Sequence, residues 1–151
     1  MCRDFKTIPA YFQQAGYYTG FLGKTHINPE RLVEDYVDHR AIQNSNFGKT
    51  ISIEEYVQQT HYVMQQAEKN QKPFLLMINY ADAHRKFVRK SKHGFPTQLV
   101  DDSIAPFPWI GSDTPHLREE LRDYFNCMNR LDEAVGMVLD KLDENGARDN
   151  T

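Results

Sequence analysis

The sequence predicts an α/β fold, with a parallel-type central sheet and helices packed on its faces. Helix-like and strand-like patterns alternate along the 151 residues, and this alternation is typical of α/β proteins. The strongest strand pattern is the apolar run 74–80, which lies between a helical segment and a polar turn. A continuous apolar run is typical of a strand covered on both faces, so we expect a central parallel strand there.

The N-terminal part of the chain is expected to hold one helix and one strand. Apolar side chains recur at helical spacing over residues 8–15, where Thr7 can cap the start and Pro9 suits the first turn. The stretch 17–23 is short and rich in aromatic and β-branched residues, which predicts a short buried strand. A polar loop without further strands is expected from there to about residue 51.

Two longer helices are expected later in the chain. The first covers about 53–70, where Ser52 and Glu55 can form a capping box. The second covers about 115–145, where Thr114 can cap the first turn. Its apolar stripe is expected to pack on a sheet face and consists of Leu117, Leu121, Tyr124, Phe125, Met128, Leu131, Val135, Val138, Leu139 and Leu142.

Residues 82–112 are expected to form a long loop, because they are rich in proline, glycine, serine and charge. A loop of this length inside a compact domain is usually functional. Its basic run 85–93 is either a solvated surface or a rim that attracts an acidic substrate. Trp109 is either a packing anchor or the wall of a sugar site, and Asp101 with Asp102 is expected to be solvent-exposed rather than a metal pair.

Composition excludes some classes of function. Hydrophobic residues make up 40% of the chain and charged residues 26%, which is ordinary for a soluble globular protein. The net charge of −3 argues against general nucleic-acid binding, which needs a basic footprint. No apolar run is long enough to span a bilayer. The two cysteines, Cys2 and Cys127, have no metal-ligand spacing.

Charged and proton-donating side chains follow both predicted strands, in residues 23–26 and 81–85. In open α/β sheets, ligands bind just outside the carboxyl ends of the strands. If the two strands are parallel neighbours, their end loops open on the same edge and bring together Lys24, His26, His84 and Arg85. Such a pocket suits an anionic ester such as a sulfate or phosphate, because lysine stabilises oxyanion charge and histidine can transfer a proton. The alternative for each residue is an ordinary loop position.

Three stretches, in the expected order, resemble the type I sulfatases of the alkaline-phosphatase superfamily. The first is Ile8–His26, with its Gly-Tyr-x-Thr-Gly-x-x-Gly-Lys-x-His pattern, and the second is Pro73–Arg85, with Asp-Ala-His-Arg at its end. The third is the tail from Tyr124, with Arg-Leu-Asp and Val-Gly on the long helix and Asp-Asn-Thr at the end. Arginine after the histidine and a late Asp-Thr-Pro are most similar to the heparan-sulfamidase-type and related bacterial sulfatases.

The resemblance implies a sulfuric ester hydrolase with a partial alkaline-phosphatase-like α/β sandwich. In that family an upstream cysteine or serine is oxidised to formylglycine, whose hydrate attacks sulfur, and a calcium ion holds the sulfate. Carried over by motif, Lys24 contacts the sulfate and the formylglycine, and His26 hydrogen-bonds the hydrate. His84 acts at the leaving oxygen as proton donor, and Arg85 contacts the substrate. The implied substrate is a small-molecule or glycan sulfate ester.

Several family features are absent from the sequence. There is no Cys/Ser-x-Pro-Ser-Arg motif, since Cys2 is followed by Arg-Asp-Phe, and Ala83 replaces the usual proline. The paired aspartates and the Asp-Asn/His-Gly metal turn are also missing, so no metal ligand is expected within this chain. We therefore expect residues 1–151 to be part of a sulfatase N-terminal catalytic domain, incomplete at both ends and inactive alone.

Two alternatives stay open at this point. One is a phosphodiesterase or phosphonate monoester hydrolase of the same superfamily, and the other is a non-catalytic binding module that reuses the fold. The chain shows no signal peptide, whereas the family is mostly exported, periplasmic or lysosomal, so the sequence leaves the compartment open. It also leaves the oligomeric state open.

Overall fold

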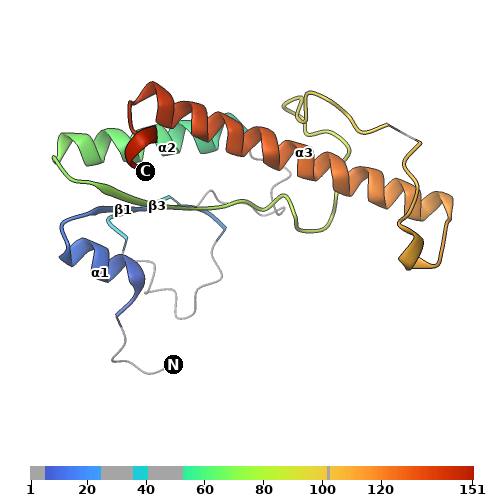
Figure 1. The fold of residues 1–151 in the computed structure, drawn as a ribbon, viewed down its shortest axis with the longest axis horizontal. Coiled ribbons are helices and arrows are strands. Elements are labelled where there is room, and N and C mark those ends of the chain that lie inside the picture. Colours follow the sequence, from blue (N-terminus) through green and yellow to red (C-terminus); the bar gives the residue numbers. More distant parts are fainter. Residues whose placement is uncertain (1–5, 25–35, 41–52, 102) are drawn as a thin grey trace. The chain divides into compact units, whose positions relative to one another are not determined.

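The computed structural model describes residues 6–24, 36–40, 53–101 and 103–151 (Figure 1). It confirms the α/β class, with parallel strands and three α-helices in the described part of the chain. The chain forms two compact units. The first unit comprises Met1–Gln43 and Tyr56–Asn79, and the second comprises Asn44–Glu55 and Tyr80–Thr151.

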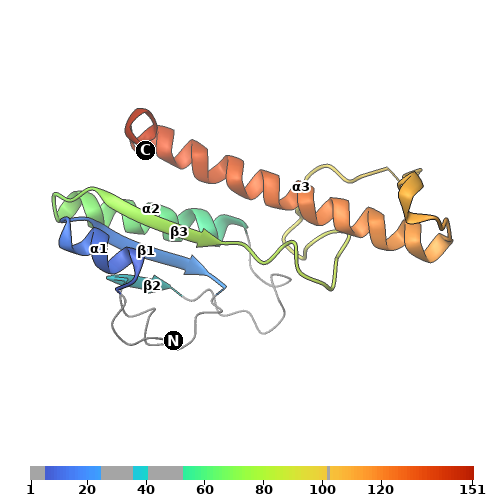
Figure 2. The same cartoon turned by 60° about the horizontal axis from the view of Figure 1, so that its bottom comes forward.

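The sheet of the first unit has three parallel strands in the order β2-β1-β3 (Figure 2). Strand β1, Tyr18–Gly23, is buried along its whole length and has a neighbouring strand on each side. Strand β3, Phe74–Asn79, pairs with β1 from Tyr18 opposite Phe74 to Gly23 opposite Asn79. The prediction that the apolar run 74–80 is the central strand is therefore wrong for the described sheet, in which β1 is central and β3 lies at an edge.

A third strand, β2, lies in a segment that the sequence predicted as loop. It comprises Asp38–Arg40 and pairs with β1 from Gly20 opposite Asp38 to Leu22 opposite Arg40. Its three polar residues show no apolar alternation, so it has no local strand signal. Its place is stabilised by hydrogen bonds to β1: the Tyr18 hydroxyl donates to Asp38 at 3.4 Å, and the Val37 amide donates to Thr19 Oγ1 at 3.1 Å.

Helices α1, Ile8–Gln14, and α2, Ile53–Lys69, cover opposite faces of the sheet (Figure 1). The Thr7 hydroxyl accepts from the Ala10 amide at 3.4 Å, which confirms the predicted cap of α1. Ser52, the predicted cap of α2, lies outside the described residues. Tyr18 and Leu22 of β1 pack on the α2 side, whereas Thr19 accepts a hydrogen bond from Gln13 of α1 at 3.1 Å, as a strand period of two requires.

The core on the α2 side of the sheet consists of apolar side chains of α2, β1 and β3. Its buried and half-buried members are Tyr18, Leu22, Tyr62, Val63, Ala67, Phe74, Leu76 and Ile78. Gly20 lies on this face without a side chain, and an added Cβ would lie 2.7 Å from Val63 Cγ1. The glycine therefore allows α2 to approach the sheet closely.

The second unit is built on α3, Pro115–Glu144, with short 3-10 turns at Pro108–Ile110 and Arg148–Asn150. The predicted cap is confirmed, because the Thr114 hydroxyl accepts from the Leu117 amide at 3.2 Å. Of the predicted apolar stripe, Val138 is buried and most other members are half-buried. Its packing on a sheet face stays a prediction, because α3 and the sheet belong to different units. The buried line of α3 is Asn126, Cys127, Arg130, Ala134 and Val138, and it is partly polar.

Within the described residues, no helix combines the length and apolarity that crossing a membrane requires.

Two glycine-to-alanine substitutions should have opposite effects on the free energy of unfolding. Gly20→Ala places a methyl group against Val63, and overpacking of this kind costs about 1–3 kcal/mol. Gly136→Ala lies inside α3 with nothing within 4 Å of the added Cβ, and should gain up to about 1 kcal/mol. Urea unfolding of the two variants beside the unchanged chain measures both effects. A neutral Gly20→Ala would contradict the close approach of α2.

Candidate active site

Lys24 is the first residue past β1, and its backbone is bound to the last residue of β3. The Lys24 amide donates to the Asn79 carbonyl at 3.2 Å, and the Asn79 side-chain amide donates to the Lys24 carbonyl at 2.9 Å. Gly23 makes this possible, because its φ is +91° and an added Cβ would lie 2.1 Å from the Asn79 carbonyl oxygen. The half-buried Lys24 is thus fixed at the carboxyl edge of the sheet.

The parallel pairing of β1 with β3 meets the condition on which the sequence-based site depends. Both strands end at the same edge, since Gly23 lies opposite Asn79. His26 lies outside the described residues. His84 and Arg85 belong to the second unit, so their convergence with Lys24 stays a prediction.

His84 lies on an exposed turn, and its ring orientation is set by a neighbouring carbonyl. The His84 amide donates to the Ala81 carbonyl at 3.0 Å, which closes the turn. Nδ1 of the His84 ring makes a short contact with the Arg85 carbonyl oxygen. A carbonyl oxygen only accepts hydrogen bonds, so Nδ1 carries the proton in this contact.

Arg85 is exposed and lies against α3. Its guanidinium forms an ion pair with Glu120 at 3.3 Å and lies 5.5 Å from the centre of the Phe87 ring. Phe87 in turn packs edge-on against Tyr124, at 5.2 Å between ring centres. An exposed ion pair of this kind contributes little to stability, so the guanidinium can exchange Glu120 for an anionic substrate at small cost.

A buried ion pair lies directly before His84 in the chain. Arg130 Nε of α3 donates to Asp82 Oδ1 at 2.5 Å, and the two residues are 4% and 6% exposed. Arg130 Nη2 also donates to the sulfur of Cys127 at 3.6 Å. From the sequence, Arg130 is recognisable only as part of the tail motif. A helical spacing of Cys127, Arg130, Ala134 and Val138 is the signal that could have placed it on the buried face.

The rest of the long loop is bound to α3 by side-chain hydrogen bonds, and Figure 1 shows the loop running beside this helix. The Val88 amide donates to Cys127 Sγ at 3.4 Å, and that thiol donates back to the Val88 carbonyl at 3.6 Å. Further along, Asn126 Oδ1 accepts from the Val100 amide at 2.8 Å. The Glu133 carboxylate accepts from the Thr97 amide at 2.8 Å and from its hydroxyl at 2.7 Å.

The prediction that Cys127 is a buried core residue is confirmed, at 1% exposure, and its thiol also binds the loop.

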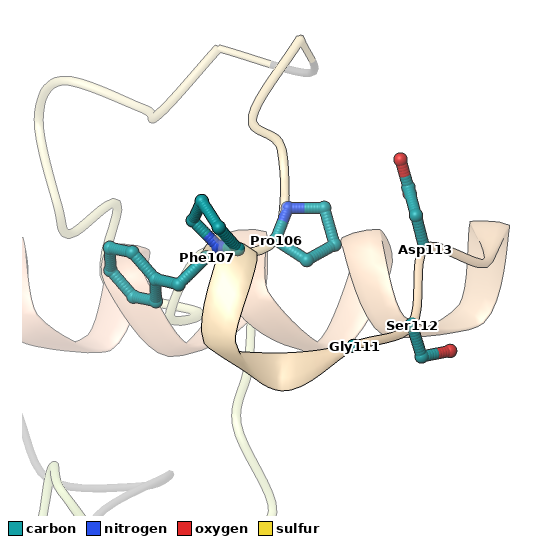
Figure 3. A pocket seen from close by; sticks show the side chains of 6 residues that line it. Pro106, Phe107, Gly111, Ser112 and Asp113 are labelled. Carbon is teal, nitrogen blue, oxygen red and sulfur yellow. The ribbon is translucent and has the colours of Figure 1, made fainter.

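A shallow pocket of about 270 Å³ lies at the other end of this loop (Figure 3). It is lined by Pro106, Phe107, Pro108, Gly111, Ser112 and Asp113. Trp109 is 79% exposed and stacks on Phe107 at 4.6 Å, so the interpretation of Trp109 as a packing anchor is wrong. Asp113 is bound at both oxygens by Arg118, each at 2.6 Å, and this hydrogen bonding lowers the pKa of Asp113.

Metal ligands do not gather in the part of the chain that the structure describes. Over the described residues, no group of three or more histidine, cysteine, aspartate or glutamate side chains could hold an ion. Asp101 is exposed, as predicted, and its side chain accepts from the Ser103 amide at 2.6 Å. Asp102 lies outside the described residues.

Comparison with known proteins gives two matches. A family model described as Sulfatase matches residues 2–151. The human N-sulphoglucosamine sulphohydrolase is 25% identical over 166 aligned residues, which cover 97% of this chain and 32% of that protein. The chain thus spans about a third of the length of the curated relative that it matches.

Tyr80 should report on the buried environment around Asp82. Burial, with a smaller contribution from the Asp82 charge, raises the pKa of Tyr80 from 10.0 to about 12. Because the folded-state pKa is raised, the stabilisation from the neutral phenol is complete below pH 10 and is lost as the pH rises towards 12. An absorbance titration should therefore show a late tyrosine step that Tyr80→Phe removes. An unchanged titration in Tyr80→Phe would contradict the burial.

Proposed function

Because this chain belongs to the sulfatase family, we propose that it forms part of the catalytic domain of a sulfuric ester hydrolase. On this proposal, residues 1–151 are a piece of the N-terminal catalytic domain. The observation that carries it is the position of Lys24, fixed by Asn79 at the carboxyl edge of two parallel strands, in a chain that a sulfatase model matches from residue 2 to 151. This edge is where ligands bind in open α/β sheets.

Lys24 is proposed to bind the sulfuryl oxygens. Its ammonium group is a compact positive charge, and its backbone is held on both sides by Asn79. A charge placed before the reaction begins stabilises the transition state without reorganisation. His26, two residues further along the same turn, is proposed to hydrogen-bond the attacking group, as the resemblance implies.

His84 is proposed to protonate the leaving oxygen. In the imidazolium form, Nδ1 donates to the Arg85 carbonyl and Nε2 carries the proton that is transferred. As the attacking group bonds to sulfur, the bond between sulfur and the leaving oxygen breaks, its electron pair stays on that oxygen, and the proton from Nε2 neutralises it. Arg85 is proposed to contact the substrate, exchanging its surface partner Glu120 for an anionic group.

The nucleophile motif and the calcium ligands expected from the resemblance do not occur in residues 1–151. The described residues include no cluster that fits a metal ion. In a complete enzyme, a formylglycine would supply the nucleophile and calcium would neutralise sulfate charge.

A sulfated sugar is the proposed substrate class. The human relative is named for N-sulphoglucosamine, and the basic run 85–93 would attract an acidic glycan by long-range electrostatics. The phosphodiesterase alternative shares the same requirement for a cationic pocket, so it is distinguished by turnover rather than by these residues.

The first test separates the roles of Lys24 and His84 in the full-length enzyme. Lys24→Ala should slow turnover of every sulfate ester by roughly a hundred- to a thousand-fold, since one preorganised charge is lost. His84→Ala should slow a sugar sulfate by about a hundred-fold or more but hardly slow nitrophenyl sulfate, whose leaving group needs no proton. Exposed His116, at the start of α3, provides the control substitution His116→Ala, which should change neither rate.

Equal losses on the two substrates in His84→Ala would remove the proton-donor role and leave His84 as a binding or structural residue.

The second test distinguishes sulfate from phosphate chemistry. The full-length enzyme should hydrolyse nitrophenyl sulfate faster than bis-nitrophenyl phosphate, and the 151-residue chain alone should hydrolyse neither. Faster turnover of the phosphodiester would favour the phosphodiesterase alternative. Turnover by the pure 151-residue chain that is lost in Lys24→Ala would show that the chain carries a complete site.

A further inference from the structure

Two buried anchors bracket the exposed residues His84 and Arg85. Before them, Asp82 is bound by Arg130 Nε at 2.5 Å. After them, the backbone of Val88 is bound in both directions by the thiol of Cys127. Arg130 and Cys127 lie one helical turn apart on α3 and contact each other through Nη2 and sulfur at 3.6 Å. The exposed turn is therefore held at both ends by a single turn of one helix.

Stability does not explain why the chain keeps a buried charge pair here. The Arg130 and Asp82 side chains are 5% and 8% exposed, so both lose nearly all their hydration. Arg130 Nη1 is also buried and has no hydrogen-bond partner among the described residues. A buried ion pair gains little over apolar residues of similar volume, because the desolvation cost offsets the attraction. Its distinctive property is direction, since the guanidinium binds the carboxylate in one orientation.

The orientation of Asp82 restricts that of His84 through the short backbone turn that contains both residues. Asp82 lies inside the turn that the hydrogen bond from the His84 amide to the Ala81 carbonyl closes. Fixing the Asp82 carboxylate against α3 fixes this turn, and the turn directs the His84 ring whose Nδ1 contacts the Arg85 carbonyl. Catalytic groups depend on such support, because a displacement of about 1 Å can cost roughly a hundred-fold in rate.

We infer that Asp82 and Arg130 are positioning residues that hold His84 in the orientation needed to protonate the leaving group. The inference rests on the proposed function, and it adds two residues that act only through His84. Removing the pair should therefore reproduce the leaving-group dependence of His84→Ala. Loss of a merely structural pair would lower turnover of all substrates alike, through the amount of folded enzyme.

The test uses the double variant Asp82→Ala/Arg130→Met in the full-length enzyme. Removing both charges avoids the unpaired buried charge that either single substitution would leave. Turnover of a sugar sulfate should fall about 10- to 100-fold with little change in KM, and turnover of nitrophenyl sulfate should fall less than about 3-fold. Adding the pair substitutions to His84→Ala should cause no loss beyond that of His84→Ala alone, because the pair acts through that residue.

The matched control removes another aspartate–arginine pair of the same unit. Asp113 and Arg118 form two contacts of 2.6 Å near the start of α3, where the pair does not hold the His84 turn. Asp113→Ala/Arg118→Met should leave the ratio of the two turnover rates unchanged. If the Asp82 and Arg130 double variant does not fold, Arg130→Lys keeps the charge but loses the planar guanidinium, and should shift the same ratio about 3- to 10-fold.

Two results would overturn the inference. One is a pair variant that folds and loses turnover equally on the two substrates, while His84→Ala still slows mainly the sugar sulfate. In that case only the positioning role of Asp82 and Arg130 fails. The other is an additive loss when His84→Ala is combined with the pair variant. Equal losses in His84→Ala by itself would instead overturn the proton-donor role in the proposed function.

Discussion

The in-register parallel pairing of β1 with β3 is the constraint on which the first half of the site depends. It ends both strands at one edge, with Gly23 opposite Asn79. The close approach at this edge excludes any side chain at Gly23, and it allows Asn79 to bind the Lys24 backbone through two hydrogen bonds. A lysine held in this way presents its charge from a fixed backbone, which a lysine on an unrestrained loop could not do.

The second unit is organised by a different kind of interaction. Helix α3 holds the long loop through polar side chains on its buried line, where Asn126, Cys127 and Arg130 each bind one segment. Apolar contacts tolerate sliding, whereas buried hydrogen bonds are directional and costly to leave unmade. The loop is therefore specified in its geometry, although it has little regular secondary structure. This is the arrangement expected where a loop must present functional side chains.

The accuracy of the sequence-based fold follows from the range over which each signal acts. The helix starts were predictable because Thr7 and Thr114 cap amides only three residues away. Strand β2 was not predictable, because its polar residues are stabilised by β1, which lies about 18 residues earlier in the chain. The polar residues on the buried line of α3 were not predictable for a related reason. The apolar period predicts the helix correctly, but the burial of Asn126 and Arg130 depends on the loop segments that they bind.

Motif and composition by themselves determined the family resemblance, the α/β class and the two strand-end segments that carry the candidate side chains. Each of these depends on residues that are close together in the sequence, so it can be read from the sequence without knowing the fold. Only the tertiary structure decided that β1 lies between two strands of the described sheet, that Asn79 binds Lys24, and that Arg130 pairs with Asp82 across 48 residues. Such contacts join residues far apart in the chain, so no local period or spacing encodes them.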